Sequence, residues 1–258
     1  MPQSPEELRA LVEDELERLP LWPQLHGQAE SVRYGLVEMR GKRVRPVLTL
    51  AVGEANGAPV EQVMPAALAI ELVHNFSLVH DDLPSLDNDE ERRGKPTVWS
   101  AYGEGTAVLA GDAMHAEAFR LACQYERSEV ARELAQATLG MIGGQYLDTM
   151  VESPELETVH RLKTGCLFYG SVAVALWAAG VPEEHQVSWR AFGDELGLLF
   201  QIVDDILDAD GYVREHGAEG ARRYADDAAE RARGRLAEVD ADTTVLRDIV
   251  DGLAVRTA

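Results

Sequence analysis

Basic residues are scarce in this sequence, and lysine is nearly absent. Of the 258 residues, 24 are Lys or Arg and 45 are Asp or Glu, which gives a formal net charge of −21 at neutral pH. The only lysines are Lys42, Lys95 and Lys163. Such a surface would repel a phosphate backbone, which excludes a nucleic-acid-binding function. A phosphorylated small molecule is compatible with this charge only where divalent cations bridge it to acidic side chains.

Cysteines and long apolar runs are also few. Cys123 and Cys166 are too few for a disulfide framework, so a reducing, cytoplasmic location is expected. Residues 1–19 carry acids where a signal peptide would have a basic region followed by an apolar one. The longest apolar run, near 171–181, is about half of the roughly 20 residues that cross a membrane. We therefore do not expect an integral membrane protein.

Helical periodicity dominates the rest of the chain. Strand signals are few, with no sustained alternation and no Asn-Gly or Asp-Gly turn between β-branched runs. Clusters of Gly and Pro at 53–59 and 180–182 indicate loops between helices. No repeat or long linker divides the chain, so the sequence predicts one all-α domain over residues 1–258. The long helices are expected at 65–79, 106–124, 132–150, 160–179 and 187–207.

A first group of carboxylates follows the apolar segment 65–79. Pro84 disfavours helix at Leu83, so Asp81 and Asp82 should lie at the C-terminal end of that helix, with Asp87 on the loop beyond it. The negative end of a helix dipole repels anions. Carboxylates there are costly unless a metal or basic groups compensate their charge.

A second group occupies a helix interior within FQIVDDILD. Gln201, Asp204, Asp205 and Asp208 fall at i, i+3, i+4 and i+7, on one face and among apolar neighbours. A lone acidic run is more often a solvated surface. Two such groups, each beside a strongly apolar helix, favour a metal site instead. Hard carboxylate oxygens suit magnesium, which also keeps waters and accepts phosphate oxygens.

Basic residues gather at three places. Lys42 and Arg45 flank Pro46, which is expected at the first position of a helix, so they would border an anion-binding helix N-terminus. Arg92, Arg93 and Lys95 follow the first acidic group, where they could form surface ion pairs or hold a diphosphate. Lys163 and Thr164 stand beside Gly165 in a helix. Taken alone, His74 is a packed core residue, and Gln145 and Asp148 are weak candidates for polar site contacts.

These segments together resemble a known family. Residues 71–97, ELVHNFSLVHDDLPSLDNDEERRGKPT, are similar to the first aspartate-rich motif of the trans-isoprenyl diphosphate synthases (polyprenyl synthetases), in the bacterial form with four residues between the aspartates. FQIVDDILD resembles the second motif, and GKRVRP, Lys163-Thr164 and GGQYLD occur in the family's order. The match covers roughly residues 30–210. It implies an antiparallel bundle of helices, usually a homodimer, with a deep central cavity.

The resemblance also implies a reaction and roles for the residues. The reaction is the head-to-tail condensation of an allylic diphosphate with isopentenyl diphosphate, with release of diphosphate. Magnesium ions, three with substrate bound, would be held by Asp81, Asp82, Asp87, Asp204 and Asp208, which together with Lys163 form the expected catalytic set. The allylic diphosphate would contact Arg92, Lys163, Thr164 and Gln201. Isopentenyl diphosphate would contact Lys42, Arg45, His74 and Arg93.

Product length in this family follows the depth of the cavity. Phe76 and Ser77 lie five and four residues before Asp81. An aromatic residue at the fifth position, with the bacterial spacing, indicates a C15 product, farnesyl diphosphate. Geranylgeranyl diphosphate, the C20 product, is the alternative.

The segment after the second motif departs from the family's pattern. Family members carry a Gly-Lys-rich segment there, whereas this chain has no lysine after Lys163 and runs directly into a charged helical pattern. Arg214, Arg222 or Arg223 are possible substitutes, although arginine and lysine are not equivalent phosphate ligands. A weakly active or non-catalytic prenyltransferase subunit is therefore a second hypothesis. A terpene cyclase ranks lower, because such enzymes lack a second DDxxD motif and do not need GKRxRP.

Overall fold

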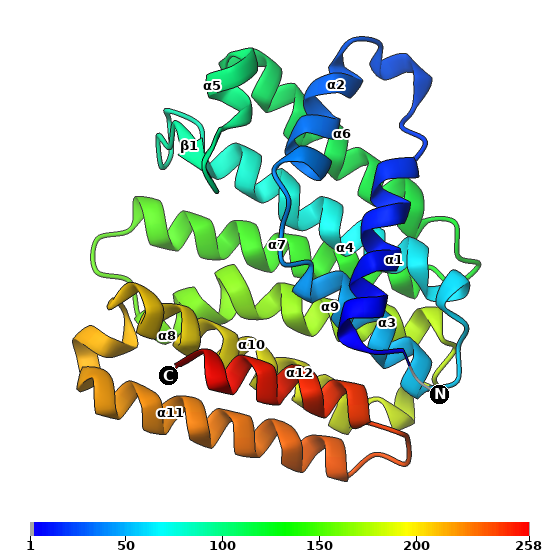
Figure 1. Ribbon diagram of the computed structural model, residues 1–258, viewed down its shortest axis with the longest axis vertical. Helices are drawn as coiled ribbons and strands as arrows, with labels where there is room; N and C mark the ends of the chain where they lie inside the picture. Colours follow the sequence, from blue (N-terminus) through cyan, green and yellow to red (C-terminus); the bar gives the residue numbers. More distant parts are fainter. Residues whose placement is uncertain (1–2, 258) are drawn as a thin grey trace.

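The computed structural model describes residues 3–257, and nearly all of its regular structure is helical (Figure 1). The predicted all-α class is confirmed. The α-helices are α1 (Pro5–Arg18), α2 (Gln28–Arg33), α3 (Val44–Ala55), α4 (Val60–Asp81), α5 (Val98–Tyr102), α6 (Glu104–Ala122), α7 (Glu129–Met150), α8 (Leu156–His160), α9 (Cys166–Ala178), α10 (Val187–Asp208), α11 (Tyr212–Ala237) and α12 (Thr244–Ala254). Short 3₁₀ turns (Pro23–Leu25, Glu183–His185, Val255–Thr257) and two π segments (Tyr34–Glu38, Arg161–Gly165) complete them.

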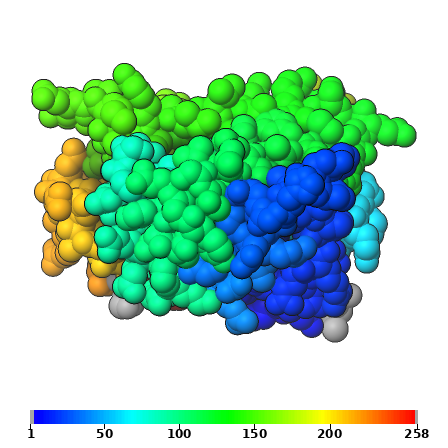
Figure 2. Space-filling model, turned by 90° about the horizontal axis from the view of Figure 1, so that it is seen from above, coloured from blue at the N-terminus to red at the C-terminus, as the bar shows by residue number. Residues whose placement is uncertain are grey.

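The long helices form a bundle around one continuous hydrophobic core. Helix α4 packs against α3, α6 and α9, while α7, α9, α10 and α11 follow one another as neighbours across the molecule (Figure 1). Helices α6 and α7 cover one whole side (green in Figure 2). The 3₁₀ turn that ends the described chain packs on α10, so the C-terminal end lies beside the second carboxylate group.

Helix α4 is apolar on most of its faces, because it lies inside the bundle. Its most apolar 18-residue window has a mean hydropathy of 1.3, so by length and composition this helix could cross a membrane. The sequence-based expectation that no segment comes near that length is therefore wrong for α4. Within the fold, 72% of this window is buried, as in the core helix of a bundle.

Helix α4 begins five residues before the predicted 65–79 and includes Pro65 in its interior. Proline disrupts the hydrogen-bond ladder of a helix. Here the Tyr125 hydroxyl enters the ladder: it accepts from the Ala66 N–H at 3.1 Å and donates to the Gln62 carbonyl at 2.7 Å. A side chain from the α6–α7 connection thus satisfies two backbone groups of α4, and the helix continues past the proline.

Other boundaries also differ from the sequence prediction in informative ways. Helix α3 starts at Val44, so Pro46 is its third residue and not its first. The preceding Arg43 has a left-handed backbone, and its buried guanidinium donates to Glu71 at 2.6 Å and to the Leu36 carbonyl at 2.7 Å. Arg43 is therefore an internal tie between α3 and α4. The predicted helix 160–179 is α8, the π segment Arg161–Gly165 and α9 in succession.

One short hairpin was not expected from the sequence. Glu91–Arg92 (β1) pairs with Lys95–Pro96 (β2) in antiparallel register. The turn between them, Arg93-Gly94, has φ values of 55° and 75°. Turns with two positive φ values match the twist of a two-residue hairpin, and Arg-Gly is a weaker signal for them than Asn-Gly or Asp-Gly.

Candidate functional site

The first carboxylate group lies where the sequence places it. Asp81 is the last residue of α4 and Asp82 is its C-cap. The loop then folds back, because the Asp87 N–H donates to the Asp81 carbonyl at 2.9 Å. Asp87 is exposed and Asp81 is half-buried, so the two carboxylates lie near one another at the end of the helix.

Burial raises the pKa of Asp81 to about 6, from an ordinary value of 3.8. Nearby Lys163 opposes the shift and Asp87 adds to it. A half-buried carboxylate at the negative end of a helix is thus short of positive charge, which is the property expected of a residue that receives a cation.

Asp82 differs from Asp81 because it already has a basic partner. Its side chain is buried and accepts two hydrogen bonds from Arg92, from Nε at 2.8 Å and from Nη2 at 2.6 Å. Burial still raises the pKa of Asp82, while the Arg92 hydrogen bond lowers it. The sequence assigned Asp82 to metal and Arg92 to diphosphate. In this structure the two side chains neutralise each other.

The second carboxylate group is divided between two kinds of surroundings. Asp205 is buried, and it accepts hydrogen bonds from Gln201 Nε2 at 2.8 Å and from the Tyr212 N–H at 2.9 Å. The Thr164 hydroxyl donates to Gln201 Oε1 at 2.7 Å. Asp205 therefore ties α10 to the start of α11, and Gln201 links it to the π segment.

Asp204 and Asp208 remain available on the same face of α10. Burial raises the pKa of Asp204, and the charges of Lys42 and Arg256 act against that shift. Asp208 is exposed near the end of the helix. Asp204, Asp205 and Asp208 line one cavity of about 390 Å³, together with His160, Lys163, Thr164 and Gln201.

A second, more apolar cavity lies beside the first. It has a volume of about 370 Å³, and Asp81 stands on its wall. Lys163 and Thr164 line both cavities, so the π segment stands between the two carboxylate groups. The other residues that line it are Arg45, His74, Phe76, Ser77, Leu78, His80, Leu86, Met141, Ile142, Gln145 and Leu167.

Arg45 and His74 form the cationic wall of the apolar cavity. The Arg45 guanidinium lies 4.6 Å from the Phe168 ring centroid and 5.6 Å from that of Phe200, and its Nη1 is 3.5 Å from His74 Nε2. Burial lowers the pKa of Arg45 to about 10 and that of His74 well below its ordinary value. Arg45 Nε is buried with no hydrogen-bond partner, so this side chain has an unused donor.

The remaining basic residues surround this region in different ways. The hairpin carries Arg93, whose Nη1 donates to the Arg40 carbonyl at 2.7 Å, and Lys95, whose Nζ donates to the Glu38 carbonyl at 2.9 Å. Lys42 is exposed at the start of α3. Lys163 forms an ion pair with Asp148 on α7. Asp148, a weak candidate in the sequence, is therefore part of the site.

Two further residues belong to the site more clearly than the sequence indicated. Gln145 lines the apolar cavity, and both polar atoms of its side-chain amide are buried without a hydrogen-bond partner. Such orphaned groups indicate a missing polar ligand. Arg256 acts electrostatically on Asp204 from the C-terminal end of the chain. No local pattern reveals Arg256, because only the packing of the chain end on α10 brings it there.

The connection after α10 is short and tightly held. Ala209 has a left-handed backbone, and α11 starts at Tyr212. The backbone of Gly211 lies directly on Asp205: a Cβ there would be 2.0 Å from Asp205 Oδ2. Of the arginines proposed to replace the missing lysines, Arg214 pairs with Asp210 at 2.9 Å, on an exposed surface.

The carboxylates fit magnesium by their chemistry. Within residues 3–257, no three His, Cys, Asp or Glu side chains already converge as a metal site. Magnesium takes one or two carboxylates and completes its octahedron with waters and phosphate oxygens, so a converged protein cage is not required. Asp81 on one cavity, and Asp204 and Asp208 on the other, supply oxygen donors of this kind.

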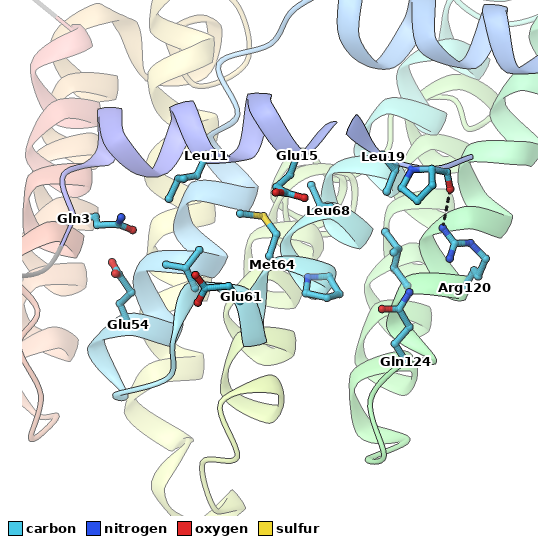
Figure 3. A pocket seen from close by; sticks show the side chains of 14 residues that line it. Gln3, Leu11, Glu15, Leu19, Glu54, Glu61, Met64, Leu68, Arg120 and Gln124 are labelled. Atoms are coloured by element: carbon cyan, nitrogen blue, oxygen red, sulfur yellow. Dashed lines mark hydrogen bonds between the residues drawn. The ribbon is translucent and has the colours of Figure 1, made fainter. Parts of the chain in front are cut away.

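Another large cavity lies away from both carboxylate groups. It has a volume of about 670 Å³ and lies between α1, α4 and the end of α6 (Figure 3). Glu15, Glu54 and Glu61 surround an apolar surface in which Met64 is central. None of the aspartates or lysines discussed above lines it. The chemistry of this chain is therefore expected at the two joined cavities.

Comparison with known proteins agrees with this location. Residues 28–228 match the family model for polyprenyl synthetases. The chain is 40% identical to the farnesyl diphosphate synthase of Bacillus subtilis over 203 residues, which cover 73% of this chain and 68% of that protein. It is 40% identical to the geranylgeranyl diphosphate synthase of Cyanophora paradoxa over 194 residues, which cover 69% of this chain and 64% of that protein.

A solved structure resembles the entire fold. The crystal structure of an FPP/GFPP synthase from Zymomonas mobilis superposes with a TM-score of 0.86 at 31% identity, and the match covers 97% of each chain. The likeness thus extends beyond the two aspartate-rich segments to the whole bundle. On these matches, the chain belongs to the polyprenyl synthetase family, the trans-isoprenyl diphosphate synthases.

Proposed function

We propose that this protein condenses an allylic diphosphate with isopentenyl diphosphate, head to tail, to give a short-chain prenyl diphosphate. The main support is the pair of joined cavities. One is lined by acids and by Lys163, Thr164 and Gln201, while the other combines an apolar wall with Arg45 and His74. A diphosphate head and a prenyl tail need these two environments side by side.

The acidic end of the site would hold the allylic diphosphate. Asp81, Asp87, Asp204 and Asp208 would bind magnesium ions, which when bound neutralise the charge of the leaving diphosphate. Lys163, now paired with Asp148, is placed to contact the same group. Asp82 and Arg92 would act together, because separation of their buried ion pair would leave Asp82 without compensation.

The basic end of the site would hold isopentenyl diphosphate. Arg45 offers an unpaired buried donor, and His74 lies within 3.5 Å of it. Lys42 and Arg93 extend the positive charge toward the protein surface. These residues would orient the double bond toward the allylic carbon, and such positioning of two reactants is itself a large part of catalysis.

The product is proposed to be farnesyl diphosphate. Phe76 and Ser77 line the apolar cavity below Asp81, and Phe76 is 7% exposed. An aromatic ring at this depth leaves less room than a small side chain would. Geranylgeranyl diphosphate is the alternative, since other side chains also shape the floor.

A homodimer is proposed as the working form. Helix α7 exposes Leu139, Ile142, Tyr146 and Met150 at 69%, 47%, 62% and 58%, and they fall on one face at i, i+3, i+7 and i+11. Val108 and Leu109 extend this apolar surface onto α6. A continuous exposed apolar face of this kind is typical of a protein interface. The cytoplasmic location expected from the sequence stays a prediction.

The test is an incubation of the purified protein with magnesium, isopentenyl diphosphate and, separately, the C5, C10 and C15 allylic diphosphates. We expect condensation that stops at C15, and a longer product from Phe76→Ala. Asp204→Ala should lose magnesium-dependent turnover while it keeps its fold by circular dichroism.

Each alternative gives a different result in the same assay. Consumption of an allylic diphosphate without isopentenyl diphosphate would indicate a cyclase. No consumption of either substrate would indicate a non-catalytic subunit, the hypothesis that the missing lysines raise. A C20 product from the wild type would place the floor below Phe76.

A further inference from the structure

The floor of the apolar cavity is supported from a second helix. The Phe76 ring on α4 lies 4.8 Å, centroid to centroid, from the ring of His115 on α6, at an interplanar angle of 38°. His115 in turn meets Phe119 edge to face at 5.2 Å. We call Phe76, His115 and Phe119 the aromatic column.

The members of the column differ in their relation to the cavity. Phe76 lines the cavity, whereas His115 and Phe119 are not part of the lining in the described chain. His115 therefore stands behind Phe76 and occupies the space into which the phenyl ring would otherwise turn. Because tightly packed interiors transmit shape, removal of a supporting ring frees its neighbour to change rotamer.

His80 and Gly111 keep α4 and α6 close at this level. His80 Nε2 lies 3.0 Å from the Val108 carbonyl oxygen. A Cβ on Gly111 would be 2.2 Å from the same His80 nitrogen, so only glycine admits the ring there. His80 also contacts Phe76 edge to face at 5.6 Å. The two helices are thus fixed against each other one turn away from His115.

We propose that His115 is a specificity-determining residue: it holds Phe76 as the floor of the cavity and so limits the length of the prenyl chain. This inference rests on the proposed prenyl-transfer function. The limit on product length is then shared between α4 and α6, and is not a property of Phe76 alone.

The environment of His115 suits a supporting role. Burial lowers the pKa of His115, and His80 acts in the same direction while Asp112 opposes it. The ring is therefore neutral at neutral pH and packs as an aromatic group. A phenyl ring should replace it without loss of the support, whereas a methyl group should not.

The first experiment compares product lengths of the wild type, His115→Ala and His115→Phe. His115→Ala is expected to raise the ratio of the next longer product to the wild-type product by about tenfold or more, the scale on which a hydrophobic pocket discriminates by size. His115→Phe should keep the wild-type product. His185→Ala, the loss of an exposed histidine far from the column, is the control and should change nothing.

A second measurement is independent of turnover. Calorimetry with unreactive C15 and C20 diphosphate analogues gives the ratio of their dissociation constants for each protein. His115→Ala should shift this ratio toward C20 by about tenfold. If His115→Ala folds poorly, Phe119→Ala tests the same column one ring further back.

Each outcome has one meaning. An unchanged product profile and an unchanged binding ratio in His115→Ala, beside a longer product from Phe76→Ala, would overturn the role of His115 while leaving the proposed function intact. A wild type that binds the analogues but condenses no substrates would reject the proposed function, and the binding ratio would still decide the role of His115.

Discussion

Among single residues, the aspartates of the two motifs are chemically distinct although they look equivalent in the sequence. Asp82 and Asp205 are buried and already accept hydrogen bonds, from Arg92 and from Gln201 and Tyr212. Asp81 and Asp204 are half-buried, and burial raises the pKa of each. One aspartate of each adjacent pair is thus committed to holding the site together, while the other is left to receive a cation.

The raised pKa of Asp81 predicts a pH dependence of stability. The folded protein binds this proton more tightly than the unfolded chain does, so the stability that protonated Asp81 contributes is present at low pH and is lost as the pH rises from 3.8 to about 6. Urea unfolding without metal should therefore show Asp81→Asn gaining stability relative to the wild type over that interval. Magnesium with diphosphate should remove the difference by stabilising the wild type. A difference that is constant with pH would contradict the raised pKa.

Among the elements, the helices were predictable from the sequence, whereas their irregularities were not. Apolar periodicity predicted α4, α6, α7, α9 and α10, because burial on one or more faces leaves its mark on a single segment. The continuation of α4 through Pro65 depends on Tyr125, which is 59 residues away from the backbone group it pairs with. The ion pair of Arg43 with Glu71 and the approach of Arg256 to Asp204 are likewise long-range. Local sequence carries no record of such pairings.

Tyr125→Phe tests the repair of α4. Loss of the hydroxyl leaves the Ala66 N–H and the Gln62 carbonyl unpaired inside the protein, which should lower the free energy of unfolding by about 1–3 kcal/mol. The free energy is measured by urea denaturation. Tyr224→Phe is the matched control, because its side chain is exposed on α11. Equal stability of the two variants would show that the backbone pairs with something else.

Gly211→Ala tests the short connection between α10 and α11. The new Cβ would meet Asp205 Oδ2 at 2.0 Å, so the turn must shift and the hydrogen bond from the Tyr212 N–H is lost. We expect a stability loss of about 1–3 kcal/mol and a higher magnesium concentration for half-maximal activity. Gly234→Ala, in the helical part of α11 with open space around it, should be neutral or slightly stabilising. An unchanged magnesium requirement would mean that the turn does not position Asp204 and Asp208.

At the scale of the whole molecule, charge and shape divide the surface into different roles. A net charge of −21 keeps copies of the chain apart, whereas the apolar face of α6 and α7 offers a place where two copies can meet (green in Figure 2). The sequence could suggest a dimer only through family resemblance, because the exposed stripe becomes visible once the buried faces of α7 are known.

Tyr146→Glu together with Leu139→Glu should convert a dimer to monomers. Each change places a charge in the centre of the apolar face, where its burial would be costly. Light scattering after gel filtration measures the mass. Val187→Glu, at an exposed valine outside this face, is the control and should leave the mass unchanged. A wild type that already runs as a monomer would reject the interface.

The scarcity of lysine gives the molecule a built-in chemical reporter. Lys42, Lys95 and Lys163 are its only side-chain amines, and all three stand around the site while the rest of the surface carries none. An amine-selective reagent therefore modifies only this region, and the intact mass counts the modified groups. Bound diphosphate with magnesium should shield Lys163 and Lys42. Lys95, which faces the Glu38 carbonyl on the far side of the hairpin turn, should stay reactive. Occupancy of the site can thus be read from mass alone, without a labelled substrate or an engineered probe.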